Sequence, residues 1–417
     1  MRKDQLASYL AGRAITSPWQ LQGERRDGFA GCVVIPALGE SERLFGTLES
    51  IAANPAELLD RFLVVVVVNH REDAPEAEKR DNAQTLARLK LLDTPLRLAY
   101  VDAAGDGLEL GAKTGGVGLA RRIGMDLALP RLESDGIMVC LDADTLVQPG
   151  YLQAITAHFA GCSAGGAVIP FCHQQGATAA QDRAIVLYEL FLRHYVLGLK
   201  QAGSPYGFHC VGSAMACTAK AYLKMGGMNS RRAGEDFYFL QQLQRTAGIA
   251  QLSGTTVRPS ARSSHRVPFG TGKSISRIIA QGEESQTFYR VDCFRILGRW
   301  LSLVERGAAL SARQLLAASE ALHPQLAAYL GQAGFEQVWQ RLRDNASGPD
   351  GLRSAFHGWF DALKTVRLVH HLSLSYPRCQ AGESIPELLQ LCGVAPVQGE
   401  WAQLRLLRAM QNGPDNN

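Results

Sequence analysis

The stretch FLVVVVV, residues 62–68, is an uninterrupted apolar run that ends in five consecutive valines. Valine is β-branched and favours strands over helices, and a strand without polar alternation is buried on both faces. The run is also far too short to cross a bilayer as a helix. It therefore predicts a central strand of a mostly parallel sheet that is covered by helices on both sides.

Similar apolar runs recur on either side of this strand and alternate with longer helix-compatible segments. The expected strands are CVVIP (32–36), LRLAYV (96–101), GIMVCL (136–141) and GAVIPF (166–171), and the expected helices cover 41–53, 76–92, 116–129 and 181–200. Alternation of this kind predicts an α/β fold with a mostly parallel sheet flanked by helices.

Beyond about residue 300 the sequence becomes rich in leucine and alanine at helical spacing. A chain of 417 residues exceeds the usual size of one domain, so an additional part is expected. We predict four parts: an N-terminal extension (1–27), the α/β domain (28–300), a helical C-terminal region (301–410) and a disordered tail (411–417).

Composition narrows the class of protein. Hydrophobic residues make up 46% and charged residues 20% of the chain, as in ordinary globular proteins, and the net charge of +4 is too small for a typical nucleic-acid binder. The nine cysteines show no Cys-x-x-Cys spacing, so neither a zinc site nor a disulfide scaffold is expected. The N-terminus lacks a signal-peptide pattern, and a cytoplasmic location is expected.

Asp142-Ala143-Asp144 directly follows the apolar run 136–141, which places both carboxylates at the carboxyl end of a buried strand. Ligands of open α/β sheets bind at that edge, and a spacing of two residues in an extended chain points both side chains the same way. Two hard oxygen donors suit Mg²⁺ or Mn²⁺. The alternative is that Asp144 or Thr145 caps a helix over 149–159.

Three motifs in this order resemble the family 2 glycosyltransferases, which have the GT-A fold. CVVIPALGE (32–40) resembles the first strand and nucleotide-contacting loop of that family, LDADTLVQPGYL (141–152) its Asp-x-Asp segment, and the segment from Gly212 to Leu243 its acceptor side with a Glu-Asp pair. The resemblance covers about residues 28–300. It implies an inverting enzyme that uses a nucleotide sugar.

The resemblance also implies residue roles. Asp144 would be the direct metal ligand, Asp142 would contact the ribose or the metal, and Asp236, beside Glu235, would take the proton of the acceptor hydroxyl. An alternative for Glu235 and Asp236 is acidic decoration of a helix N-terminus. A late histidine often completes the metal or diphosphate site in GT-A enzymes, which suggests His265; a purely structural histidine is the alternative. The remaining implied contacts are Pro36, Glu40, Arg262 and Arg266 on the donor side and Gly212 and Ser213 on the acceptor side.

Two features depart from the family or stand outside it. The second strand ends in VVNHRED, where the family commonly has two acidic residues, so Asn69 or Asp73 is a candidate replacement. The segment 106–129 places Lys113, Gly116 and Arg121 at the start of a predicted helix, where N–H groups and the dipole favour an anion. A mobile loop with solvated basic residues is the alternative there.

These observations predict transfer of a sugar from a UDP- or GDP-linked donor to a hydroxyl acceptor, with a divalent cation (Mn²⁺ or Mg²⁺) as cofactor. Polysaccharide or glycolipid synthesis is the expected context. A sugar nucleotidyltransferase and a non-catalytic nucleotide-sugar-binding protein are the alternatives. No nucleic-acid partner is expected, while peripheral membrane contact and a homodimer stay open.

Overall fold

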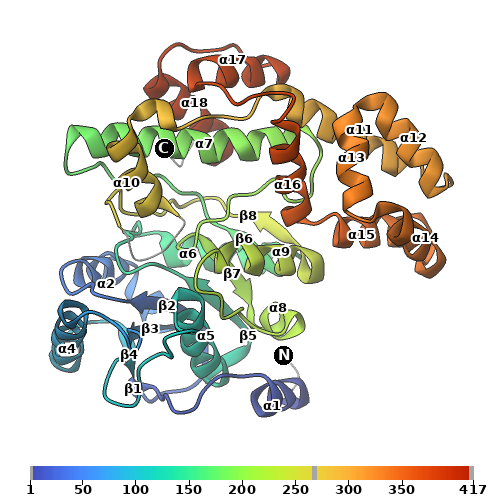
Figure 1. Ribbon diagram of the computed structural model, residues 1–417. Coiled ribbons are helices and arrows are strands. Elements are labelled where there is room, and N and C mark those ends of the chain that lie inside the picture. Colours follow the sequence, from blue (N-terminus) through green and yellow to red (C-terminus); the bar gives the residue numbers. More distant parts are fainter. Residues whose placement is uncertain (1–2, 265–269, 413–417) are drawn as a thin grey trace. The chain divides into compact units, whose positions relative to one another are not determined.

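One sheet organises the first part of the computed structural model, which describes residues 3–264 and 270–412. Its eight strands follow the order β1-β4-β3-β2-β5-β7-β6-β8 (Figure 1). Strands β4, β3, β2 and β5 are parallel to one another, and β6 is parallel to β8. Strand β1 is antiparallel to β4, and β7 is antiparallel to both β5 and β6. The bounds are β1 (Gln22–Gly23), β2 (Phe29–Ala37), β3 (Phe62–Asn69), β4 (Arg97–Ala103), β5 (Leu132–Cys140), β6 (Gly166–Val168), β7 (Met215–Thr218) and β8 (Ile249–Gln251).

The expected central strand is confirmed. All eight residues of β3 are buried, and β3 pairs in parallel with β2 on one side and β4 on the other. Valine side chains on both faces of the strand must then be covered by helices. The helices of this part are α1 (Lys3–Gly12), α2 (Leu44–Ala52), α3 (Ala56–Leu59), α4 (Glu76–Leu91), α5 (Val117–Ala128), α6 (Tyr151–Gly161), α8 (Ala219–Met225) and α9 (Glu235–Ala247).

The chain divides into two compact units. Unit 1 comprises residues 1–182, 210–276 and 408–417, and unit 2 comprises residues 183–209 and 277–407. The predicted α/β class with a mostly parallel sheet and a helical C-terminal region is confirmed. Unit 2 also takes in 183–209 and 277–300, which the sequence grouped with the α/β domain, and the predicted tail begins inside a helix, since Gln411 and Asn412 belong to α18.

Unit 2 is built from helices around an aromatic core. Trp300 and Trp339 are fully buried, and Trp300 packs edge-to-face on Phe335 with ring centroids 5.2 Å apart. Large aromatic side chains bury much apolar surface each and dominate such a core. Helices wholly in unit 2 are α11 (Val291–Arg306), α12 (Ala312–Leu322), α13 (Pro324–Gln332), α14 (Phe335–Asn345), α15 (Gly348–Trp359), α16 (Ala362–Leu372) and α17 (Ala381–Leu391); α7 (Ala179–Gln201), α10 (Thr271–Gln281) and α18 (Glu400–Asn412) have residues in both units.

A buried carboxylate fastens the N-terminal segment to unit 1. Asp126 of α5 accepts hydrogen bonds from the hydroxyls of Tyr9 and Tyr222, each 2.7 Å, and from the backbone N–H of Ile15 at 2.8 Å. Burial raises the pKa of Asp126 despite these donors. The described part of the predicted extension, residues 3–27, is therefore packed into unit 1, with α1 against α8 and β1 paired with β4.

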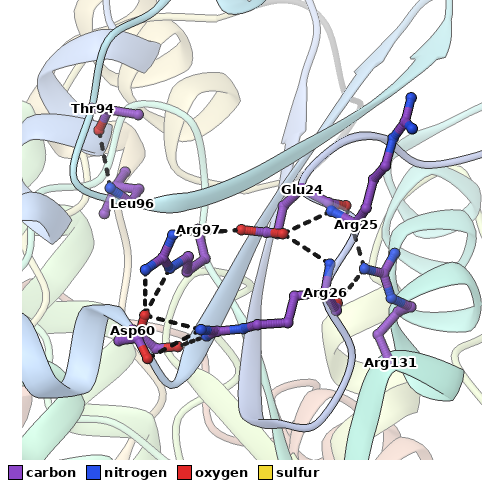
Figure 2. A network of polar contacts seen from close by, with 8 residues as sticks. All are labelled: Glu24, Arg25, Arg26, Asp60, Thr94, Leu96, Arg97 and Arg131. Carbon is purple, nitrogen blue, oxygen red and sulfur yellow. Dashed lines mark hydrogen bonds and ion pairs between the residues drawn. The ribbon is translucent and has the colours of Figure 1, made fainter.

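Ion pairs connect the segments at the amino ends of the parallel strands (Figure 2). Arg26, which precedes β2, and Arg97, the first residue of β4, both donate to Asp60, which precedes β3. These hydrogen bonds lower the pKa of the Asp60 carboxyl, with the Arg97 bond contributing most. The Asp60 carboxylate therefore offsets part of the positive charge of Arg26 and Arg97 at this edge.

Helix α5 approaches the sheet closely at Gly124, and a prediction follows from the spacing. A Cβ atom there would lie 2.5 Å from Cγ1 of Val34 and 2.8 Å from Cγ2 of Val67. We expect Gly124→Ala to destabilise the protein by about 1–3 kcal/mol, measured by urea unfolding, because the strand side chains cannot move away. Gly46→Ala in α2, whose Cβ would meet nothing within 4 Å, is the control and should be neutral or stabilising. Equal effects of both changes would contradict the packing described.

Candidate functional site

Acidic side chains gather where the parallel strands β2 and β5 end. These strands are neighbours, with Val34 paired to Cys140. Glu40 follows β2 and is 7% exposed, whereas Asp142 and Asp144 follow β5. The hydroxyl of Thr47 donates to the carbonyl of Ala143 at 2.9 Å and so ties the chain after β5 to α2. The strand-end placement predicted for Asp142 and Asp144 is therefore present.

Neither Asp144 nor Thr145 caps the next helix. Helix α6 begins at Tyr151, its N-cap is Gly150, and it has no side-chain cap. The Thr145 hydroxyl is buried and has no hydrogen-bond partner in the described part of the chain. The capping alternative for the Asp-x-Asp segment is therefore not what the structure contains.

One arginine joins Glu40 and Asp144. Arg262 donates from Nε to Asp144 Oδ2 at 2.8 Å, and its Nη2 contacts Glu40 Oε1. The side chains of Arg262, Asp144 and Glu40 are 20%, 17% and 7% exposed. Burial raises the pKa of Asp144 to about 6, against the opposing effect of the Arg262 charge.

The segment that carries Arg262 is fixed beside the Asp-x-Asp loop. Leu146 and Arg258 exchange two backbone hydrogen bonds of 3.1 and 2.8 Å. The side-chain amide of Gln174 donates to the carbonyls of both Asp144 and Arg258, at 2.9 and 2.6 Å. These contacts bring residues more than a hundred positions apart into one site. No motif in the sequence pointed to Gln174.

A second arginine joins Asp142 to Glu235. Arg121 of α5 donates from Nη2 to Asp142 Oδ1 at 2.5 Å and from Nε to Glu235 Oε1 at 3.2 Å, and its side chain is only 2% exposed. Burial opposes its charge, but the carboxylates of Asp142 and Glu235 outweigh this and raise the pKa of Arg121. Its Nη1 is buried without a partner in the described residues. The neighbouring Arg122 turns away, toward Asp126.

Glycines allow close packing around Arg121 and at the start of α5. A Cβ at Gly212 would lie 2.6 Å from Nη2 of Arg121, and a Cβ at Gly118 would lie 2.4 Å from the carbonyl of Arg231. Gly116, predicted on the donor side, packs against the backbone of Arg232, 2.6 Å from where its Cβ would be. The start of α5 therefore packs against the chain that leads to α9.

Glu235 and Asp236 open α9, after Gly234 in the left-handed conformation (φ 69°). Asp236 is half-buried and accepts a hydrogen bond from the backbone N–H of Phe237 at 2.7 Å. Burial, and then the negative charge of Glu235, raise the pKa of Asp236 to about 7. Burial also raises the pKa of Glu235, although Arg121 opposes it. A carboxylate with a pKa near neutrality is suited to accept a proton at physiological pH.

The other predicted residues lie in varied surroundings. Ser213 is fully buried, and its hydroxyl has no hydrogen-bond partner among the described residues. The amide of Asn69 donates to the carbonyls of Ala37 and Val67, so it braces the ends of β2 and β3. Asp73 forms an exposed ion pair with Arg71 at 3.0 Å. Pro36 is half-buried in β2, Lys113 is exposed in the loop before α5, and His265 and Arg266 lie outside the described residues.

Five carboxylates therefore lie around two guanidinium groups in this part of unit 1. They are Glu40, Asp142, Asp144, Glu235 and Asp236, and the guanidinium groups belong to Arg121 and Arg262. Within residues 3–264 and 270–412 no three histidine, cysteine, aspartate or glutamate side chains gather closely enough to hold a metal ion. The donor set nevertheless suits a hard divalent cation, because it is all carboxylate oxygen with an excess of negative charge.

Comparison with known proteins identifies no family for this chain. No known family matches the sequence, and no curated protein matches it. Residues 1–349 of TarS from S. aureus, in complex with UDP-GlcNAc, match with a TM-score of 0.40 and 14% identity, over 79% of this chain and 91% of that one. Mannosyltransferase PcManGT from Pyrobaculum calidifontis, in complex with GDP-Man and Mn²⁺, matches with a TM-score of 0.37 and 16% identity, over 99% of this chain and 93% of that one.

A third solved structure is glucosyl-3-phosphoglycerate synthase from Mycobacterium tuberculosis in complex with UDP. It matches with a TM-score of 0.34 and 17% identity, over 69% of this chain and 84% of that one. Likeness at this level concerns the fold alone, so an activity has to be argued from the side chains of the site. No helix in the described part of the chain combines the length and apolar character needed to cross a membrane.

Proposed function

We propose that this chain is a glycosyltransferase of the family 2 type that moves a hexose-type sugar from a UDP or GDP sugar to a hydroxyl acceptor, with inversion. The observation that carries the proposal is the arrangement of Asp142, Asp144 and Asp236 around Arg121 and Arg262 at the carboxyl edge of the sheet. Open α/β sheets bind their ligands at that edge.

Asp144 and Asp142 are the residues proposed to hold a divalent cation, Mn²⁺ or Mg²⁺. His265 remains the proposed third ligand. Bound there, the cation would neutralise charge on the leaving diphosphate. On the donor side, the nucleotide would be positioned by Glu40, Arg262 and Lys113. Further proposed donor contacts are Arg266, Pro36, Asp73 and Gly116. The side-chain amide of Asn69 already donates to two backbone carbonyls.

Asp236 is the proposed general base. Its carboxylate would take the proton of the acceptor hydroxyl as that oxygen attacks the sugar, and single displacement of this kind inverts the anomeric carbon. Glu235, held by Arg121, would fix the start of α9 and so the direction of Asp236. Gly212 and Ser213 would line the acceptor side. The proposed context is polysaccharide or glycolipid synthesis in the cytoplasm.

Thermal unfolding with added nucleotides tests the proposal. A ligand that binds only the folded state stabilises it, by about 2.7 kcal/mol at 100 times its Kd. We expect UDP or GDP to raise the melting temperature, and Mn²⁺ to increase the effect. Stabilisation by UTP or GTP alone would favour a sugar nucleotidyltransferase instead. Diphosphate binding without release of diphosphate from any UDP or GDP sugar, with acceptors present, would favour a non-catalytic binding protein.

A further inference from the structure

The guanidinium of Arg262 lies on the carboxylate that is proposed to bind metal. It donates to Asp144 Oδ2 at 2.8 Å and contacts Glu40 Oε1 with another nitrogen. Both carboxylates are largely buried, and each would be costly to leave unpaired. In the ligand-free protein the arginine thus supplies the positive charge that this part of the site requires.

We propose that Arg262 is a stand-in cation that a divalent metal ion must displace from Asp144, and that the displaced guanidinium then positions the donor diphosphate. The inference rests on the proposed function and adds a competition to it. Metal and Arg262 compete for one oxygen atom, Asp144 Oδ2, which already accepts the hydrogen bond from Arg262 Nε. A planar guanidinium also fits phosphate oxygens with two parallel hydrogen bonds, as it fits carboxylates.

Arg262 is better placed for such an exchange than Arg121. Its side chain is 20% exposed, compared with 2% for Arg121, and it belongs to a loop segment between Val257 and Ser264, whereas Arg121 belongs to helix α5. A side chain in a loop can change its contacts without movement of a helix. Arg121 is therefore expected to stay in place while Arg262 moves.

The test measures binding of Mn²⁺ alone, by the electron paramagnetic resonance signal of the free ion, in the full chain. Arg262→Gln removes the competing charge, so we expect Mn²⁺ to bind at least about threefold more tightly than to the unaltered protein. Arg262→Lys keeps the positive charge, so its affinity for Mn²⁺ should stay close to that of the unaltered protein. Arg26→Gln is the matched control, because it removes one positive charge at the opposite edge of the same sheet (Figure 2). It should leave the affinity for Mn²⁺ unchanged.

The second measurement is calorimetric binding of UDP and GDP at saturating Mn²⁺. Here the expected sign reverses: Arg262→Gln should bind the diphosphate about tenfold more weakly, because a charge-assisted contact to phosphate is lost. Arg262→Lys should lose less affinity for the diphosphate, because lysine keeps the positive charge. A variant that merely disturbed the site would weaken both metal and diphosphate binding, so the opposite signs distinguish the exchange from a structural role.

Two outcomes overturn the inference, and they differ in what they say of the proposed function. Unchanged or weaker Mn²⁺ binding in Arg262→Gln, with binding abolished in Asp144→Asn, would overturn the exchange and leave the metal site in place. Absence of Mn²⁺ binding from every variant, with and without diphosphate, would overturn the metal part of the proposed function and the inference with it.

Discussion

Asp236→Asn is expected to lower the rate of sugar transfer by about 10²–10⁴-fold, the usual contribution of a general base. UDP or GDP should bind as before, because Asp236 lies on the acceptor side of the proposed mechanism. The rate of transfer by the unaltered protein should rise with pH through about 7, since the carboxyl of the proposed base is protonated and inactive below its pKa. Full transfer activity in Asp236→Asn would refute the assignment.

The same substitution should change stability in a pH-dependent way. The pKa of Asp236 is raised from 3.8 to about 7, so the folded state holds a proton that the unfolded state releases between these values. Stability from this group is therefore present below pH 4 and is lost as pH rises to about 7. The charged groups that face Asp236 are Glu235, Arg121 and Asp142, and of these Glu235 contributes most to the raised pKa.

Unfolding by urea at pH 4 and pH 8 measures this effect. Asp236→Asn should be more stable than the unaltered protein at pH 8 and similar to it at pH 4. Because solvent screens a half-buried side chain, we expect about 1–2 kcal/mol rather than the full value of the shift. Asp135→Asn, at an exposed position in β5, is the control and should show no difference at either pH. A gain in the free energy of unfolding of Asp236→Asn at pH 4 instead of pH 8 would contradict a raised pKa of Asp236.

Arg121→Met is expected to destabilise unit 1 by about 3–5 kcal/mol, because removing one partner of a buried ion pair leaves the other charges uncompensated. Two carboxylates, Asp142 and Glu235, lose their cation at once. Urea unfolding of the ligand-free protein measures the loss. Adding Glu235→Gln to Arg121→Met should recover part of it, since one of the two unpaired charges is then gone. A double variant as unstable as the sum of the single variants would contradict the pairing.

The central strands were predictable because each is a local apolar run. The runs 32–36, 62–68, 96–101 and 136–141 correspond to β2, β3, β4 and β5, with ends that differ by a few residues. Strands β7 and β8 were not predicted. Both are short, and their pairing depends on partners far along the chain: Met215 pairs with Cys140, and Ile249 with Gly166. Local composition carries no information about such partners.

Placement of the acidic residues was predictable for the same reason, since Asp142 and Asp144 follow a strand directly. The ion pairs could not be predicted: Arg262 is 118 positions from Asp144, and Arg121 is 114 positions from Glu235. The sequence suggested a phosphate-binding helix start at Gly116, but not that the backbone of Arg232 packs against that position. Two arginines next to each other in sequence, 121 and 122, also acquired separate partners, because neighbours on a helix point in different directions.

The buried carboxylate of Asp126 sets where the protein can be shortened. A shortened protein that starts at residue 28 would lack the Tyr9 hydroxyl and the Ile15 N–H, two of the donors that satisfy Asp126. It would also uncover Gly227, whose missing side chain makes room for the Tyr9 ring. The first residue at which a shorter protein can begin is therefore decided by α1, which packs on α8, and not by the first strand of the parallel sheet.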